Sequence, residues 1–78
     1  MTEKLFEIVS KVLTMPVEKI NDASGPETIE GWDSFNLYVL LDEIETAYNV
    51  RFELDEILEI KNVGHFKRIL QKHGVTDF

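Results

Sequence analysis

The sequence predicts an all-α fold, a small four-helix bundle of three longer helices and one short helix, with a long loop between the first two. Three stretches repeat apolar residues at the three- and four-residue spacing of a helix with one buried face. The 44% share of hydrophobic residues is ordinary for a globular protein and too high for a disordered chain. Because 78 residues without cysteine leave room for one small core, we expect a single domain over residues 1–78.

The first helix is expected to begin at Thr2, whose hydroxyl suits an N-cap, with Glu3 in the first turn, where the helix dipole favours an acid. Since Pro16 cannot continue a helix, we expect this one to stop at about Met15. Its predicted buried stripe consists of Leu5, Ile8, Val9, Val12 and Leu13.

A long polar connection follows over residues 16–33, interrupted by turn-forming Asn, Asp, Ser, Gly and Pro residues. Connections beyond about 12–15 residues are uncommon in compact domains and are usually functional or disordered. Ile20, Ile29 and Trp32 are apolar, which favours a loop packed on the helices, with Trp32 completing the core. A short helix is possible around Val17 to Ile20.

The second helix is predicted over Ser34–Tyr48, with Asp33 as its N-cap and Asn49 as its C-cap. Further apolar residues lie off the buried stripe, so this helix has more apolar surface than one buried face needs. The stripe is Leu37, Leu40, Leu41, Ile44 and Tyr48, and the apolar residues off it are Phe35, Tyr38 and Val39.

The stretch 54–60 is too short for more than a helix of one or two turns. Asn62 is expected to cap the last helix, which Gly74 ends, and the tail 75–78 is expected to fray. The buried stripe of the last helix is predicted to be Val63, Phe66, Ile69, Leu70 and, at its end, His73.

Charge is distributed unevenly in this chain of net charge −7. No Lys or Arg lies between Lys19 and Arg51, where seven acids fall: Asp22, Glu27, Glu30, Asp33, Asp42, Glu43 and Glu45. Such a region repels a phosphate backbone, which argues against nucleic acid, and attracts a basic protein surface. The alternative is a solvated face that only keeps the protein soluble.

The sequence also argues against a membrane span and against a secretory signal. No run of about 18 apolar residues exists, and no basic region followed by an apolar run begins the chain. We therefore expect a cytoplasmic protein.

Catalysis and metal binding find little support in the sequence. The stretch Gly31-Trp32-Asp33-Ser34-Phe35 is not a G-x-S-x-G motif, because the serine falls one place too late. Only His65 and His73 could serve as its base, and both belong to the last helix. The acids at 42, 43 and 45 lack calcium-loop spacing, and the four glycines form no phosphate loop. We expect neither an enzyme nor a metal site.

Ser34 is the candidate functional residue because it lies at the predicted start of a helix. A helix N-terminus offers unpaired N–H groups and a partial positive charge, so a phosphate attached there is stabilised. The alternative is that Asp33-Ser34 is merely a common way to begin a helix.

Together these features resemble the acyl carrier protein family. An Asp-Ser-(large apolar) signature opens the second of four helices behind a long loop, and the likeness extends over nearly the whole chain. Most of it lies in Gly31 through Tyr48 and in Val50-Arg51-Phe52; weaker support comes from Ile60, Val63, Phe66 and Ile69.

The resemblance implies that Ser34, within a motif that includes Asp33, is the attachment point of 4′-phosphopantetheine. A separate phosphopantetheinyl transferase would move this group from coenzyme A onto the hydroxyl. The thiol of the arm would carry acyl groups as thioesters, which explains how a cysteine-free protein can do thiol chemistry. The protein, a monomer by expectation, would present this cargo to acyl-activating, acyltransferase or synthase enzymes.

In this family the usual partner surface is the second helix and the loop before it, here the region without basic residues. We expect basic docking patches of partners to contact Phe35, Asn36, Val39, Asp42 and Glu45. Fatty-acid carriers most often have leucine after the serine, and acids two and five places beyond it. This chain has Phe35, Asn36 and Val39 there, which favours a specialised lipid or polyketide pathway over general fatty-acid synthesis.

Two alternatives remain from the sequence. One is an aminoacyl or peptidyl carrier of the same fold. The other is an acidic helical interaction module that is never modified and docks through Phe35, Tyr38 and Val39.

Overall fold

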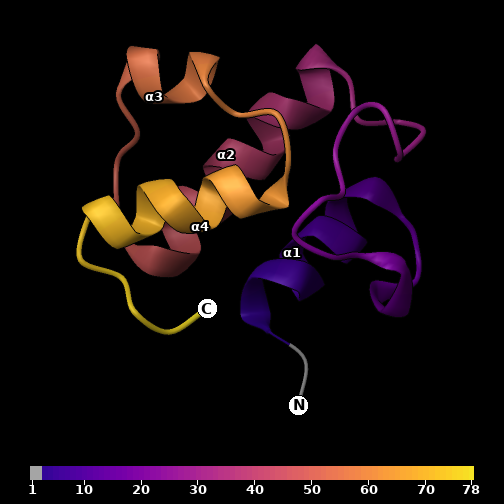
Figure 1. The fold of residues 1–78 in the computed structure, drawn as a ribbon, viewed down its shortest axis with the longest axis horizontal. Helices are drawn as coiled ribbons and strands as arrows, with labels where there is room; N and C mark the ends of the chain where they lie inside the picture. The colour runs from indigo at the N-terminus through magenta and orange to yellow at the C-terminus, as the bar shows by residue number, and fades with distance from the viewer. Residues whose placement is uncertain (1–2) are drawn as a thin grey trace.

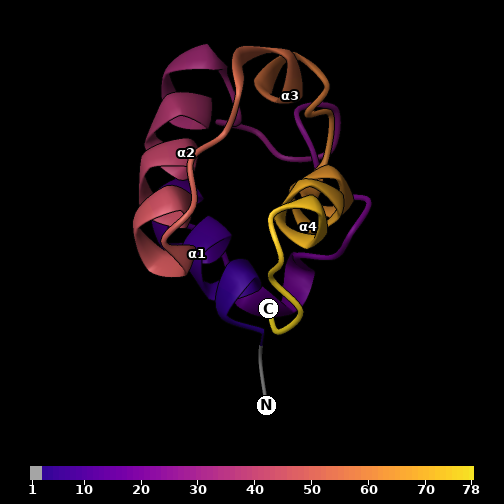
Figure 2. The same ribbon diagram turned by 90° about the vertical axis from the view of Figure 1, so that its left-hand side faces the viewer.

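The structure, a computed structural model, describes residues 3–78. These residues form a bundle of four α-helices and one 3-10 turn, without strands. The elements are α1 (Lys4–Leu13), η1 (Val17–Lys19), α2 (Ser34–Tyr48), α3 (Leu54–Leu58) and α4 (Val63–Lys72). Helices α2 and α4 lie on opposite sides of the bundle, and α3 lies at the end where α2 begins (Figure 1, Figure 2). The all-α prediction is confirmed.

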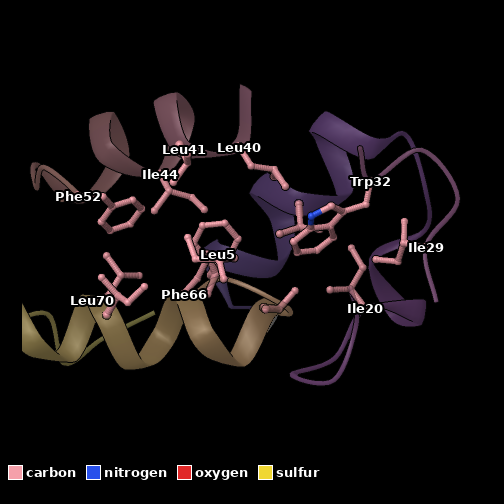
Figure 3. Packing of buried hydrophobic residues seen from close by; sticks show 14 residues of the cluster. Leu5, Ile20, Ile29, Trp32, Leu40, Leu41, Ile44, Phe52, Phe66 and Leu70 are labelled. Carbon is pink, nitrogen blue, oxygen red and sulfur yellow. The ribbon is translucent and has the colours of Figure 1, made fainter. Parts of the chain in front are cut away.

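Phe66 of α4 lies at the centre of the core and is fully buried. Its ring centroid is 6.2 Å from that of Trp32 and 6.1 Å from that of Phe52, so it joins the loop before α2 to the segment after it. Figure 3 shows these rings among the aliphatic side chains. The buried apolar residues are Leu5, Val9, Ile20, Ile29, Trp32, Leu40, Leu41, Ile44, Phe52, Ile60, Val63, Phe66, Ile69 and Leu70.

The long connection before α2 is packed against the helices, as its apolar residues predicted. Ile20, Ile29 and Trp32 are each at most 6% exposed. Main-chain hydrogen bonds join the loop to the start of α4, from Val63 N–H to the Ser24 carbonyl and from Gly64 N–H to the Asp22 carbonyl. The short helix expected near residues 17–20 is present as η1.

Helix α1 differs from its prediction at both ends. Glu3, expected in the first turn, is the N-cap residue and makes no capping hydrogen bond with its side chain, while Thr2 lies outside the described residues. The helix ends at Leu13 because Thr14 turns into the left-handed region, where its N–H bonds to the Ser10 carbonyl. Pro16 lies beyond this turn, so the predicted end at Met15 is wrong by two residues.

The predicted bounds of α2 and both of its caps are confirmed. Asp33 Oδ1 accepts a hydrogen bond of 2.9 Å from Asn36 N–H, and Asn49 has φ 56° at the C-cap. Leu40, Leu41 and Ile44 are buried, whereas Leu37 and Tyr48 at the ends of the stripe are half-buried.

The final helix follows its predicted pattern except at His73, which is the exposed C-cap residue after Lys72 and not part of the buried stripe. Asn62 Oδ1 accepts from His65 N–H at 2.9 Å, and Gly74, with φ 92°, follows the helix. The tail also differs from its prediction. The tail 75–78 was expected to fray, yet the main-chain oxygen of Phe78 accepts hydrogen bonds from Leu5 N–H and from the Tyr48 hydroxyl, both at 2.9 Å. These bonds attach the tail to α1 and α2.

Candidate functional site

Ser34 is the first residue of α2, and the loop before it is held in place by a small hydrogen-bond network. Asn36 donates through its side-chain amide to the Gly31 carbonyl at 2.6 Å and through its backbone N–H to Asp33. Gly31 has φ 95°, a conformation that glycine adopts without steric cost. The network fixes the direction in which the chain enters α2.

Trp32 attaches the segment before α2 to the hydrophobic core. Its side chain is 6% exposed and packs against Phe66, whereas Ser34, two residues later, is exposed. Because the Trp32 side chain is fixed in the core two residues before Ser34, the serine hydroxyl is held at the surface in a defined position.

The first turn of α2 leaves two backbone amides for an anion. The first N–H groups of a helix have no intrahelical acceptor. Asp33 satisfies that of Asn36, but no acceptor for the N–H of Ser34 or Phe35 occurs among the hydrogen bonds of residues 3–78. A phosphate on Ser34 would lie next to both amides and at the positive end of the helix dipole.

An open pocket of about 210 Å³ adjoins the serine. Its lining consists of Pro26, Trp32, Asp33, Ser34, Leu37 and Ile60, which come from the long loop, α2 and the segment after α3. Four of these six are apolar, so a flexible arm leaving the Ser34 hydroxyl has apolar side chains to contact.

Neither histidine lies at this pocket. His65 Nδ1 accepts from Lys61 N–H at 2.8 Å, and His73 contacts Glu56 in α3. The residues that line the pocket next to Ser34 therefore include no histidine. Within residues 3–78 no cluster of three potential metal ligands occurs, and none of the described helices has the length and apolar character to cross a membrane.

The predicted partner-binding residues have different environments. Phe35 is 76% exposed, Asp42 is also exposed and Val39 is half-buried. Asn36 bonds within the loop, and the Glu45 carboxylate accepts from Phe52 N–H at 2.7 Å. The last two side chains therefore have structural partners within the chain, besides any role on the surface.

Sequence reasoning missed an apolar part of this surface on α3. Leu54 is 69% exposed and Leu58 is 70% exposed, and with Phe35 and Tyr38 they are the large apolar residues most exposed in the described chain. The i, i+4 spacing of Leu54 and Leu58 indicates that both lie on one face of α3. A helix of five residues, however, shows too little periodicity to tell a buried face from an exposed one.

Glu56, also missed, is a buried acid of α3 at 4% exposure. The backbone N–H of Glu53 and then the ring of His73 lower the pKa of its carboxyl to about 2, against the opposing effect of burial. Lys72 adds an ion pair at 3.3 Å. In the sequence it is one of three acids in the stretch 54–60, so nothing there distinguishes it from a solvated carboxylate.

One comparison with known proteins gives the family. The chain matches the family model described as phosphopantetheine attachment site over residues 3–70, a range that includes Ser34 and all four helices except the last two residues of α4. No curated protein matches the chain. The family match confirms the resemblance found in the sequence.

Proposed function

The chain belongs to the phosphopantetheine attachment site family, and from this premise we propose that it is an acyl carrier protein with its arm on Ser34. Domains of this family carry covalently attached 4′-phosphopantetheine and are carriers rather than catalysts. The proposal concerns the attachment residue and the kind of cargo.

The observation that carries the proposal is the position of the Ser34 hydroxyl. It is exposed at the start of α2, beside two backbone amides without an acceptor and next to an apolar pocket. These residues fit the group: the amides of Ser34 and Phe35 suit its phosphate, and Leu37, Ile60 and Trp32 suit its aliphatic part. When bound, the group supplies a thiol that holds acyl groups as thioesters.

Attachment needs a separate transferase because no histidine lines the pocket beside the serine, and the neighbouring Asp33 carboxylate is engaged in capping α2. Ser34 Oγ forms a bond to the β-phosphorus of coenzyme A, and the pyrophosphate P–O bond breaks. Adenosine 3′,5′-bisphosphate leaves, and the hydroxyl proton passes to a base of the transferase. The chain contributes the position of Oγ and the amides that stabilise the phosphate.

A partner surface on α2 and α3 supports presentation of the cargo to enzymes. Tyr38 lies one helical turn before the exposed acid Asp42 on α2, and α3 exposes Leu54 and Leu58. Such side chains suit a partner with apolar and basic groups. Because Phe35 replaces the usual leucine and Asn36 the usual acid, we favour partners of a specialised lipid or polyketide pathway. That the carrier acts as a cytoplasmic monomer stays a prediction.

Intact-protein mass spectrometry tests the attachment residue. After incubation with coenzyme A and a broad-specificity phosphopantetheinyl transferase, the wild-type chain should gain the mass of one phosphopantetheine. Ser34→Ala should gain none, whereas Thr46→Ala, which removes another exposed hydroxyl of α2, should gain it in full.

Two results would contradict the proposal. One is an unmodified wild-type chain when the transferase modifies a known carrier in the same tube. The other is an undiminished mass gain in Ser34→Ala. Acyl and aminoacyl carriers are separated by the next step, in which the holo chain is offered to enzymes that load fatty acids or amino acids.

A further inference from the structure

A second, larger pocket lies between the end of α3 and the middle of α4. It encloses about 470 Å³ and is lined by Leu58, Glu59, Lys61, His65, Arg68 and Ile69. Leu58 and Ile69 are apolar, while three of the remaining four side chains are basic or can become so. Such a concentration stands out in a chain of net charge −7.

The basic groups of this pocket are available to a ligand. The lysines 11, 67 and 72 pair with carboxylates, but within residues 3–78 neither Lys61 nor Arg68 forms an ion pair. His65 Nδ1 accepts from Lys61 N–H, so the neutral ring carries its proton on Nε2 and offers a donor there. Glu59 is the one acid of the lining. Two cations and a further donor beside an apolar wall suit an amphipathic anion.

Pockets that share lining residues form a row between this site and Ser34. The pocket beside Ser34 shares Pro26 with a pocket of about 310 Å³, and that one shares Lys61 with the basic pocket. Helix α3 lies at the same end of the molecule as the start of α2 (Figure 1, Figure 2). An extended phosphopantetheine arm is about as long as five extended residues, roughly 16–18 Å. The molecule measures 29 × 28 × 19 Å, so the arm reaches across much of one face.

Resting on the proposed function, we propose that this pocket binds a carboxylate at the far end of the carried acyl group. The cargo class is then an acyl chain that ends in a free carboxylate. A docking role for the pocket is less favoured, because a partner with a basic patch for Asp42 would be repelled by Lys61 and Arg68. The proposal rests on the row of pockets that lies between Ser34 and the two cations Lys61 and Arg68, neither of which forms an ion pair within residues 3–78.

The test measures the acidity of the cargo itself. The chain is loaded by the transferase from adipoyl-coenzyme A labelled with ¹³C at the terminal carboxyl, and mass spectrometry verifies the loading. Titration by ¹³C NMR should give the terminal carboxyl an acid dissociation constant about fivefold larger than it has in free adipoyl-pantetheine. This increase is equivalent to about 1 kcal/mol of binding. The net negative charge of the chain alone would instead decrease this constant.

Variants assign the effect to the pocket. Lys61→Gln with Arg68→Gln should abolish the fivefold increase, whereas Arg51→Gln, an exposed cation of the segment after α2, should keep it. The backbone amides of Lys61, His65 and Arg68 should shift with adipoyl cargo and remain unshifted with hexanoyl cargo, which lacks the carboxylate.

Each adverse result has its own meaning. A loaded chain whose terminal carboxyl has the acidity of the free compound overturns this inference alone. If the pocket amides then shift on addition of a glutamate-rich peptide, the pocket belongs to an acidic partner, and the inference is likewise wrong. Failure to load in the presence of an active transferase overturns the proposed function and this inference with it.

Discussion

His73 Nε2 lies 3.0 Å from Oε1 and 3.2 Å from Oε2 of Glu56, so the end of α4 is tied to a buried carboxylate of α3. Oε1 also accepts from Glu53 N–H at 2.8 Å. Because α3 has only five residues, it cannot be stable by itself. These bonds keep α3, and the exposed Leu54 and Leu58 on it, in a fixed position on α4.

Glu56→Gln should lower the free energy of unfolding at pH 7 by about 2 kcal/mol, because a charged acceptor is lost. The folded-state pKa of Glu56, about 2, lies below its ordinary value of 4.5. Its contribution is therefore fully present above about pH 4.5 and is lost as the pH falls toward 2. Urea unfolding from pH 7 to 2.5 should show the two stabilities converging over this range. A constant difference would contradict the role of the ionised carboxylate.

Asp33→Ala should destabilise the chain by about 1 kcal/mol through loss of the N-cap, and Asp33→Asn by much less, since its amide oxygen can still accept from Asn36 N–H. In the alanine variant the first turn of α2 should fray, and modification of Ser34 by the transferase should become slower as a result. Urea unfolding and a mass-spectrometric time course measure the two effects. Equal stabilities of the two variants would rule out the capping bond as the cause.

Glu45→Ala should cost about 1–2 kcal/mol, since the buried Phe52 loses the carboxylate that its N–H contacts at 2.7 Å. Hydrogen exchange of the Phe52 amide should become faster in this variant and stay unchanged in Asp42→Ala, which removes an exposed acid of the same helix. Slow exchange in both variants would show that Glu45 has no such structural role.

Asp42→Lys should slow association with the phosphopantetheinyl transferase several-fold at low salt while the melting temperature stays nearly constant. Asp42 is exposed, and α2 contains no Lys or Arg whose charge would offset that of its carboxylate. Stopped-flow binding at two ionic strengths measures the rates, with Asp77→Lys on the exposed tail as the charge-matched control. Equal slowing by both variants would indicate overall charge rather than a defined docking surface.

Gly25→Ala should destabilise the chain by about 1–3 kcal/mol, because a Cβ on this residue would collide with the Lys61 carbonyl oxygen. The affected contact is the one between the long loop and the start of α4. Thermal unfolding measures the loss, and Glu27→Ala, an exposed change in the same loop, should leave stability nearly unaltered. A Gly25→Ala chain as stable as Glu27→Ala would mean that the loop can move away at little cost.

Local sequence was enough to predict α2 and α4 with their caps. Asp33, Asn49 and Asn62 act within one turn of their own positions, and the apolar period of each helix spans several turns. The end of α1 was predicted two residues too late because Pro16 gives only an outer limit, and the left-handed turn at Thr14 precedes it.

The sequence by itself determined the all-α class, the start of α2 at Ser34 and the family, because helical periodicity, caps and a short motif are local properties. Tertiary structure alone decided that Glu45 contacts Phe52, that Glu56 is buried against His73, and that Lys61 and Arg68 line one pocket. Each of these depends on how helices and loops pack against one another. Such packing brings together residues whose own spacing in the chain gives no sign of contact.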